Sequence, residues 1–402
     1  MARFTLVLLG AVCLGWHTPG VLSGQAQNFT VVRTIESELL ADPFAVREAS
    51  DGAVFVSDPI SKGIFRVSAS GEWTQIAREG QGPGELRSFG GLSLCGGRLN
   101  ALDASSRSVA RFEEDGRFLD VVRVRVQAFP SPHYALILAL ALPEDKVLTV
   151  PAVFSDAIAS GQLEEAPFVR FARDGEMLDT LLLQPVAGTF VKLETGSGVR
   201  PSVRQPFLSR PELAPDLRCQ FLVLVEEVPL GLRLTWVMLS DGERTVQEIP
   251  VDRVRLSRRD VDAALARLSG NAERWGTQPA RLESVYRRTV TIPDHEPVFT
   301  DAFAASGGYV WLRGFPTSDQ VTWTRYSLRG EPAVRITLPR RDTIKDAAHD
   351  WIWIVRKDEL DVPRLVKLKV GQLQPSPRMR PVMGSGGKGV GNARVIRNKA
   401  FR

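Results

Sequence analysis

The sequence repeats itself at an interval of 45 residues, and no other feature restricts the fold as strongly. In each unit an aspartate ends one β-type run, an apolar residue ends the next, and a glycine follows four residues later. These landmarks are Asp58 and Asp103, Val67 and Phe112, and Gly71 and Gly116. A period of about 40–45 residues with several short β runs per unit is typical of a β-propeller blade.

The apolar residue with a glycine four positions later occurs five times along the chain. The pairs are Val67/Gly71, Phe112/Gly116, Phe171/Gly175, Met238/Gly242 and Tyr326/Gly330. Each glycine lies between two β-type runs, which is the pattern of a β-hairpin. We interpret the five hairpins as the third and fourth strands of five blades.

A sixth unit, residues 346–370, ends without a fourth strand, whereas residues 29–35 form a β-type run that belongs to no unit. A propeller has to close its ring, because an open first or last sheet leaves an unpaired edge. The sequence therefore predicts an all-β fold, a six-bladed β-propeller with four antiparallel strands per blade. The N-terminal strand 29–35 closes the last blade.

One insertion between the repeats is predicted to be helical. Ser257 provides a start cap, and Gly270 with Asn271 ends the helix. Its apolar face consists of Val261, Ala264, Leu265 and Leu268. Such a helix packs over a surface of the sheets or caps the mouth of the ring.

The first 26 residues have the pattern of a secretory signal peptide, with Arg3 as the positive charge, an apolar stretch over 4–16 and a small-x-small site over 24–26. The apolar stretch is too short to span a bilayer. We predict cleavage after Ala26, no lipid on Cys13, and a periplasmic or extracellular protein without a membrane span. The predicted domains are the signal peptide 1–26, the propeller 27–371 and a basic disordered tail 372–402.

The net charge of +5 comes from this tail, which holds seven basic residues and no acidic one. Without the tail and Arg3, acidic residues outnumber basic ones. We infer that the basic isoelectric point belongs to a disordered tail rather than to a binding face. No nucleic acid partner is expected, because Phe401 is the only aromatic residue of the tail and base stacking needs such residues.

After the signal peptide two cysteines remain, Cys95 and Cys219, in different repeat units. A disulfide between them is feasible but not expected, because an exported chain of this length can form its core without one. The sequence contains no C-x-x-C motif and no Cys/His spacing typical of a zinc site.

The segment from Gly80 to Leu86, Gly-Gln-Gly-Pro-Gly-Glu-Leu, resembles the glycine loop of NHL-type repeats. It precedes a strand, a strand that ends in Asp103 and a strand that ends in a glycine turn. Over roughly residues 30 to 370 the chain is similar to the secreted six-bladed β-propeller proteins of bacteria. The resemblance implies the propeller fold and a binding role on the propeller face, without an assigned activity.

Loops after the second and fourth strands of a blade open on one face of a propeller, and the candidate residues lie in or next to them. We select six ligand-binding candidates: Gly82, Gly84, Glu85, Asp58, Asp103 and Arg313. Glycine N–H groups can hold an anion or a carbonyl, and aspartates can bind calcium or sugar hydroxyls. The alternative is structural, with glycines in a tight crossing and aspartates that cap their own turns.

Two functions remain open. The leading hypothesis is a binding module without catalysis, whose partner is a protein, a peptide or a small molecule. The alternative is a metal-dependent, calcium-using hydrolase or lactonase-like enzyme, or a lyase, with its ion at the channel mouth. The histidines after the signal peptide, His133, His295 and His349, lie far apart in the sequence. We predict no catalytic residue and no cofactor, with calcium left open, and we expect a monomer.

Overall fold

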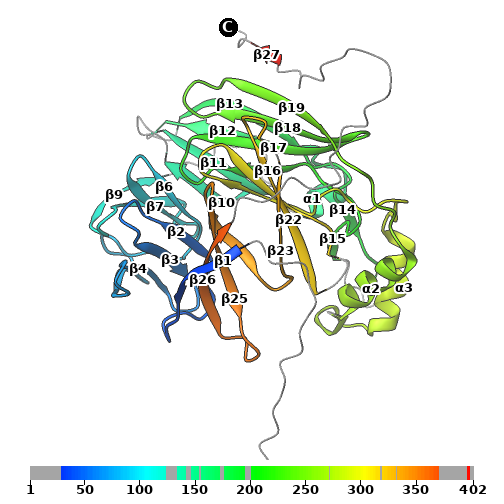
Figure 1. Ribbon diagram of the computed structural model, residues 1–402, viewed down its shortest axis with the longest axis horizontal. Helices are drawn as coiled ribbons and strands as arrows, with labels where there is room; N and C mark the ends of the chain where they lie inside the picture. Colours follow the sequence, from blue (N-terminus) through cyan, green and yellow to red (C-terminus); the bar gives the residue numbers. More distant parts are fainter. Residues whose placement is uncertain are drawn as a thin grey trace, which may run out of the picture.

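The computed structural model describes residues 29–123, 134–141, 146–153, 155–172, 176–194, 201–270, 272–316, 319–331, 333–370 and 396–398. Over these residues the chain forms a β-propeller of four-stranded antiparallel blades (Figure 1). Five sheets have four strands, one has a fifth strand added, and a small separate sheet has two. We number the larger sheets one to six along the chain.

The six larger sheets contain the following strands. The first sheet has β2 (Ala45–Glu48), β3 (Val54–Asp58), β4 (Gly63–Val67) and β5 (Trp73–Arg78), and the second has β6 (Leu92–Cys95), β7 (Arg98–Asp103), β8 (Ser108–Glu113) and β9 (Phe118–Arg123). The third has β10 (Tyr134–Ala141), β11 (Val147–Val153), β12 (Glu165–Phe171) and β13 (Met177–Pro185), and the fourth has β16 (Glu212–Pro215), β17 (Phe221–Val228), β18 (Gly231–Met238), β19 (Arg244–Pro250) and β27 (Ile396–Asn398). The fifth has β20 (Asp301–Ala305), β21 (Tyr309–Arg313), β22 (Gln320–Ser327) and β23 (Val334–Pro339), and the sixth has β24 (Thr343–Ala347), β25 (Trp351–Lys357), β26 (Pro363–Val370) and β1 (Phe29–Ile35).

The five predicted hairpins are confirmed as the third and fourth strands of the first five sheets. They are β4–β5, β8–β9, β12–β13, β18–β19 and β22–β23. Gly71, Gly116, Gly242 and Gly330 have φ angles between 72° and 95°, a region that residues with a Cβ rarely adopt. The fifth landmark, Gly175, lies outside the described residues.

The N-terminal strand pairs where the sequence predicts. β1 runs antiparallel to β26, from Phe29 opposite Val370 to Ile35 opposite Leu365, so the sixth sheet takes strands from both ends of the chain. The first strands of consecutive sheets lie side by side, with β2 next to β6, β16 next to β20, β20 next to β24, and β24 next to β2. The outer edge of β26 is therefore paired rather than open.

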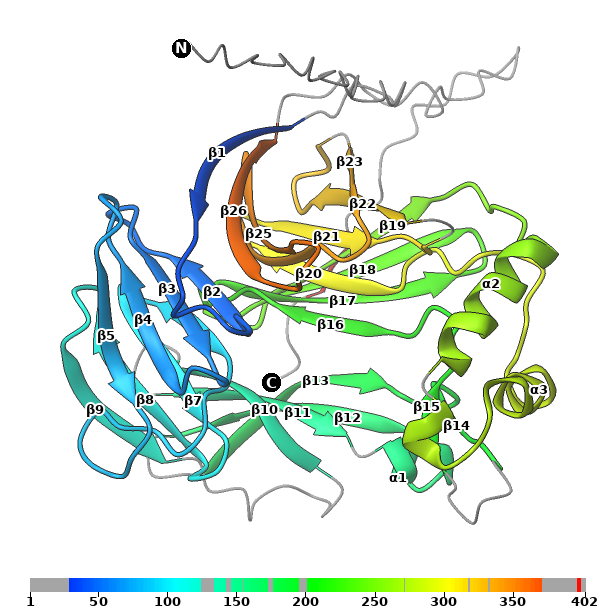
Figure 2. The same ribbon diagram turned by 90° about the horizontal axis from the view of Figure 1, so that it is seen from below.

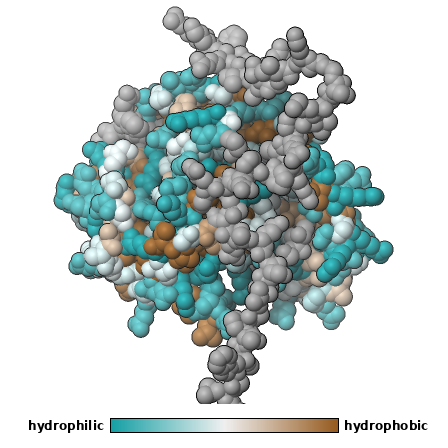
Figure 3. Space-filling model, viewed as in Figure 1, coloured by the Kyte–Doolittle hydropathy of each residue, from teal (hydrophilic) through white to brown (hydrophobic). Residues whose placement is uncertain are grey.

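The hydrophobic core lies between neighbouring sheets. Phe55 and Phe112 belong to one cluster that joins the first and second sheets, and Trp311 and Ile354 belong to one that joins the fifth and sixth. Trp236, in the fourth sheet, has no exposed surface. On the face shown in Figure 3, hydrophilic residues predominate and apolar ones gather in small groups. Apolar burial between sheets is therefore the main source of stability.

Insertions within the third sheet, between the third and fourth sheets, and between the fourth and fifth sheets form a layer at one side of the propeller (Figure 2). They contain a short helix α1, the two-stranded sheet β14–β15, the helices α2 and α3, and a 3₁₀ turn. Their bounds are α1 Ser155–Ala159, β14 Phe190–Lys192, β15 Ser202–Arg204, α2 Arg258–Ser269, α3 Pro279–Thr289 and Ala272–Trp275 for the 3₁₀ turn.

The predicted helix is confirmed as α2. The Ser257 side chain accepts a hydrogen bond from the backbone N–H of Asp260, and Gly270 caps the C-terminal end. The second helix, α3, was not predicted. Leu265 of α2 packs with Leu282 of α3 and with Phe207 beside β15 in one buried cluster. This cluster fixes α2 against the segment that follows β15.

The cysteine pair differs from the expectation. Cys95 and Cys219 form a disulfide, with 5.3 Å between their Cα atoms. Cys95 ends β6, and Cys219 lies in the turn between β16 and β17. Their positions in different repeat units gave no sign that the two turns meet, so the sequence-based expectation was wrong.

A short part of the predicted tail is also structured. Residues 396–398 form β27, which pairs antiparallel with the outer strand β19, Ile396 lying opposite Val246. The prediction of a tail without structure does not hold for these three residues. The rest of 372–402 and the predicted signal peptide 1–26 lie outside the described residues.

Candidate functional site

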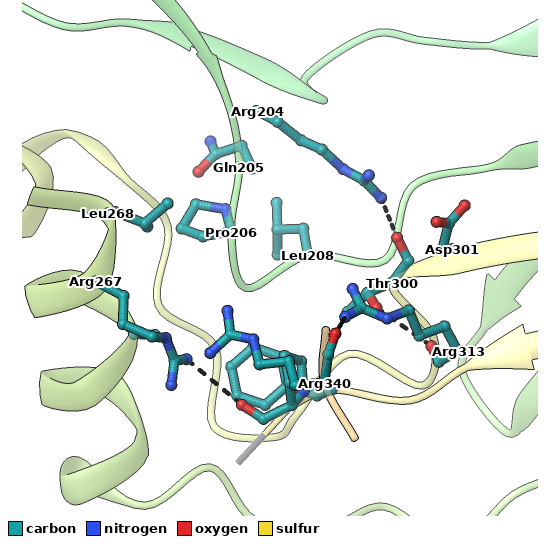
Figure 4. Close-up of a pocket in the computed structure, with 13 residues that line it drawn as sticks. Arg204, Gln205, Pro206, Leu208, Arg267, Leu268, Thr300, Asp301, Arg313 and Arg340 are labelled. Atoms are coloured by element: carbon teal, nitrogen blue, oxygen red, sulfur yellow. Dashed lines mark hydrogen bonds between the residues drawn. The ribbon is translucent and has the colours of Figure 1, made fainter. Parts of the chain in front are cut away.

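A pocket of about 440 Å³ lies where the fifth sheet meets the inserted helix α2 (Figure 4). Its walls come from the segment after β15, from α2, from the start of β20, and from the ends of β21 and β23. The end of a second strand and the end of a fourth strand lie at the same end of an antiparallel sheet. The pocket therefore opens at the end of the fifth sheet that the sequence analysis assigned to ligands.

Four arginines line this pocket, each from a different element. Arg204 ends β15, Arg267 lies in the last turn of α2, Arg313 ends β21, and Arg340 directly follows β23. Figure 4 shows their side chains distributed around the cavity. We call the pocket lined by these four residues the arginine pocket.

The arginine side chains donate hydrogen bonds to backbone carbonyls. Nη2 of Arg204 lies 2.6 Å from the carbonyl oxygen of Thr300. Nη2 of Arg313 lies 3.5 Å from that of Arg340, and Nη2 of Arg267 lies 3.5 Å from that of Pro316. These bonds use one or two of the five N–H groups of a guanidinium, so donors remain available toward the cavity.

Within the described ranges, none of the four arginines forms an ion pair with a carboxylate. Arginines elsewhere in the fold are paired in this way. Arg210 lies 2.6 Å from Glu212, and Arg356 lies 2.7 Å from Asp342. The arginine pocket therefore concentrates positive charge that is not directly paired with carboxylates of the described residues.

The pKa directions reflect this crowding of cations. Burial, and next the nearby charge of Arg210, lowers the pKa of Arg204. Burial, and next Arg340, lowers the pKa of Arg267. Burial also lowers the pKa of Arg313, with Asp301 opposing the shift and Arg340 adding to it. A bound anion would relieve this repulsion, because an opposite charge favours the charged form of each guanidinium.

Asp301 is the one acidic residue among those that line the arginine pocket in the described chain. It is exposed at the start of β20. The nearby Glu212 forms an ion pair with Arg210, and burial raises the pKa of the Glu212 carboxyl group. Acidic groups therefore compensate only a part of the positive charge around the cavity.

One side of the arginine pocket is apolar. Pro206 and Leu208 follow β15, Ala264 and Leu268 come from α2, and Phe315 and Pro316 follow β21. Figure 4 shows Leu268 beside Arg267, across the cavity from Arg313, with Pro206 and Leu208 between Arg204 and Arg340. A cavity with an apolar wall and convergent charged donors suits a small organic anion with an apolar body.

Of the six candidates from the sequence, Arg313 is the one that lines this pocket. Arg204, Arg267 and Arg340 were not selected. Arg204 and Arg267 belong to insertions without a repeat register, and Arg340 is half of an Arg-Arg pair that follows β23. A charge sum over the chain does not reveal a local cluster such as these four arginines.

Asp58 and Asp103 lie at the ends of β3 and β7 and cap loops there. The Asp58 carboxylate accepts backbone N–H groups of Ala41, Asp42, Ile60 and Ser61 at 2.7–3.0 Å. The Asp103 carboxylate accepts the N–H groups of Arg87, Ser105 and Ser106, and the Ser88 hydroxyl. Both side chains are buried. These bonds favour the structural interpretation of the two aspartates.

The backbone of the glycine loop, from Gly80 to Leu86, binds the carboxylate of Glu85, which belongs to the loop itself. Oε2 of Glu85 accepts the N–H groups of Gln81 and Gly82 at 3.0 and 2.9 Å, and Oε1 lies 2.9 Å from Nε of Arg78. Gly84 adopts a φ of 76°. Of the glycine N–H groups that the sequence analysis proposed for a ligand, that of Gly82 donates to Glu85, and that of Gly80 donates to the carbonyl of Leu86 at 3.0 Å.

Buried charges fill the space between the first, fourth and sixth sheets. Nη2 of Arg218 lies 3.3 Å from Oδ2 of Asp346 and donates to the carbonyl of Glu48 at 2.6 Å. Arg47 donates to the carbonyl of Leu92 at 2.8 Å and also to that of Lys345. Desolvation lowers the pKa of Arg47 to about 10. This network joins inner strands and their turns.

The histidines do not come together in the described part of the chain. His295 lies in a bridge with Arg255, and His349 packs against the ring of Tyr309. His133 lies outside the described residues. A search of the described residues finds no group of three His, Cys, Asp or Glu side chains arranged to hold a metal ion.

No protein-family model and no curated protein matches this chain. Solved structures match with low similarity. They include virginiamycin B lyase from Staphylococcus aureus, at 12% identity over 85% of this chain and 99% of the other, with a TM-score of 0.42. Another is a Bacteroides fragilis protein whose name describes it as a putative exported protein. It has 12% identity over 86% of this chain and 95% of the other, with a TM-score of 0.45.

A third similar structure is aldose sugar dehydrogenase from Streptomyces coelicolor, at 15% identity over 85% of this chain and 97% of the other, with a TM-score of 0.38. Similarity at this level does not transfer a function, so the site has to be interpreted from its own residues. None of the helices in the described residues has the length and apolar character needed to cross a membrane.

Proposed function

We propose that this protein is a ligand-binding β-propeller that takes a small organic anion into the arginine pocket. The observation that carries the proposal is the set of four arginines around one cavity, without a carboxylate partner among the described residues. A guanidinium offers a planar pair of donors that matches a carboxylate or a phosphate. The apolar wall would hold the body of the same ligand.

The position of the pocket supports a recognition role. Its residues come from a strand end, a strand start and two insertions, while the sheets beneath hold these elements in place. Binding residues are commonly found on loops that a rigid scaffold positions. No step of catalysis is part of the proposal.

We further propose that the six larger sheets are six blades of one ring and that the protein is exported. The register of β1 against β26 supports a single closed ring. The pattern of residues 1–26 supports export with cleavage after Ala26. N-terminal sequencing of the mature protein tests the second statement, and a chain that still begins at Met1 would contradict it.

The binding proposal is tested by isothermal titration of the purified protein with octanoate and benzoate, and with the neutral amides of the same acids. We expect the acids to bind and the amides to bind at least tenfold more weakly. Arg313→Ala should weaken binding of the acids by roughly tenfold to a hundredfold, which is the range for losing one hydrogen bond to a charged group.

Arg117→Ala serves as the matched control, because Arg117 is an exposed arginine in the turn between β8 and β9, outside the pocket. Its affinity for the acids should equal that of the unchanged protein. Equal affinity for acids and amides, or an unchanged affinity in Arg313→Ala, would refute an anion site at these arginines.

A further inference from the structure

A second pocket, of about 660 Å³, adjoins the arginine pocket. The two share Arg340, which lines both. The second pocket also contains Arg341, which follows in sequence, and Arg356 and Lys357 from the end of β25. We call it the Arg341 pocket. None of the six candidate residues from the sequence lines it, and the proposed function does not use it.

The backbone of Arg340 is held between the two cavities. Its carbonyl oxygen accepts the bond from Arg313 at 3.5 Å, and its N–H donates to the carbonyl of Asp319 at 2.7 Å. Among the described residues no hydrogen bond or ion pair involves the guanidinium of Arg340. The structure therefore fixes the position of this residue and leaves its charged group without a structural partner.

The other cations of the Arg341 pocket divide into paired and unpaired groups. Arg356 is bound to the buried Asp342 at 2.7 Å, and Lys357 lies 3.3 Å from Asp42. Arg341 is exposed and has no carboxylate partner in the part of the chain that the structure describes. Arg341 is thus the second cation, beside Arg340, that is available to a ligand.

We propose that the ligand is an organic dianion whose two acidic ends bind on either side of Arg340. The first end lies among Arg204, Arg313 and Arg340, and the second end lies at Arg341. This inference rests on the proposed function, since the first end uses the arginine pocket. The acidic ends share the chemistry of carboxylate and phosphate, both of which match guanidinium groups.

The charge balance supports two anionic ends rather than one. Seven basic residues and three acidic residues line the two pockets together, and basic residues remain in excess when Asp42, the partner of Lys357 outside the lining, is included. The chain outside the tail and the signal peptide is acidic in sum, so this excess is local. A single carboxylate would neutralise little of it, whereas a second charge on the same molecule would bind at high effective concentration.

The apolar wall suggests what joins the two ends. Leu208, Leu268 and Phe315 line the arginine pocket beside the cations. An aliphatic or aromatic spacer could pack on this wall while the acidic ends reach the guanidinium groups. Such a ligand would satisfy the apolar and the charged parts of the site at the same time.

The experiment compares straight-chain dicarboxylates of increasing length with monocarboxylates of the same length, by calorimetric titration of the full-length mature protein. A parallel series of alkyl bisphosphonates and monophosphonates distinguishes the two kinds of acidic end. We expect at least one length at which the diacid binds more than tenfold tighter than its monoacid. Arg341→Ala should remove this gain and leave the monoacid affinity unchanged.

Arg335→Ala is the matched control, because Arg335 is an exposed arginine of β23 that lines neither pocket. It should keep the gain. If monoacids bind and no diacid binds tighter, the dianion is refuted and the proposed function stands. If the gain persists in Arg341→Ala, the placement of the second acidic end at Arg341 is refuted and the proposed function stands. If neither monoacids nor diacids bind, the proposed function and this inference fail together.

Discussion

Cys95 and Cys219 are joined by a disulfide although 124 residues separate them in the sequence. Next to the bond, the backbone N–H of Leu94 donates to the carbonyl of Leu217 at 2.8 Å. The second and fourth sheets are therefore connected directly, past the third. The connection lies beside the buried network of Arg47, Arg218 and Asp346.

Removing this disulfide should destabilise the fold substantially. A crosslink across a loop of this length restricts the unfolded chain, and the expected contribution is roughly 2–5 kcal/mol. We expect the double variant Cys95→Ala, Cys219→Ala to lose that amount of unfolding free energy in urea. Chemical reduction of the unchanged protein should give a similar loss. A double variant as stable as the oxidised protein would show that the bond does not form.

Asp216 makes the stability of the same region depend on pH. Burial raises the pKa of its carboxyl group to about 6, and the nearby charge of Asp346 adds to the rise. The backbone N–H groups of Arg218 and Gln220 and the charge of Arg218 act in the opposite direction and lower the pKa. The folded state then binds the proton more tightly than the unfolded state. The contribution of Asp216 to stability is highest below the ordinary pKa of aspartate and falls as the pH rises toward and past about 6.

The loss from Asp216 should be on the order of 3 kcal/mol between about pH 3 and pH 8, since each pKa unit corresponds to about 1.4 kcal/mol. Asp216→Asn should show a smaller fall over the same range, measured by urea unfolding at several pH values. Arg218 and Arg47 are the cations that face this group, and Asp346 titrates in the same direction. Parallel pH curves for the variant and the unchanged protein would contradict the assignment.

The parts of the fold that depend on local pattern were predictable. Alternating residues around a glycine turn indicated each hairpin, and Ser257 with the spacing of Val261 and Leu265 indicated α2. The helix α3 carried a comparable signal, with Pro279 at its start and Leu282, Val285 and Tyr286 on one face. Contacts between turns far apart in sequence, such as Cys95 with Cys219, leave no periodic trace.

The arginine pocket was predictable only in part, for a similar reason. Arg313 was selected because it ends a second strand, and strand ends keep a register within the repeat. Arg267 and Arg204 come from insertions, whose placement depends on the packing of Leu265 against Phe207 and Leu282. Composition gave no indication of the cluster either, because the residues outside the tail and the signal peptide carry a net negative charge that does not show a local excess of arginine.

Asp58 should matter for folding more than for any ligand. Four backbone N–H groups donate to its two buried carboxylate oxygens. In Asp58→Asn an NH₂ group replaces one oxygen and leaves two donors without an acceptor, so we expect a loss of about 2–4 kcal/mol. The exposed Asp115, which accepts one N–H from Arg117, provides the control Asp115→Asn with little change. A neutral effect at Asp58 would mean that the loop tolerates another conformation.

Truncation after Gly371 should change stability only slightly. Of the residues removed, the described ones form the three pairs between β27 and β19, at the outer edge of the fourth sheet. We expect the unfolding free energy to fall by less than about 2 kcal/mol, a range typical of changes away from the core. A larger loss in thermal or urea unfolding would mean that the tail packs against the propeller.

Glu85 should act as the anion that orders the glycine loop. The N–H group of Gly82, followed by the Arg78 side chain, holds the pKa of its carboxyl group below the usual range. Because this pKa is lowered on folding, the stabilisation is present above the ordinary pKa of glutamate and is lost as the pH falls through the folded value. Leu86 is buried and anchors the end of the loop through its bond to the carbonyl of Arg78 at 3.0 Å.

Glu85→Ala should therefore lower the melting temperature at neutral pH and have a smaller effect in acid. The freed N–H groups of Gln81 and Gly82 form a vacant anion site, so added phosphate should restore part of the lost melting temperature in the variant and have no such effect on the unchanged protein. Glu79→Ala is the control, because Glu79 is an exposed glutamate beside the loop, paired with Lys62. A Glu85→Ala protein with unchanged melting and no response to phosphate would show that the loop is ordered by its backbone bonds alone.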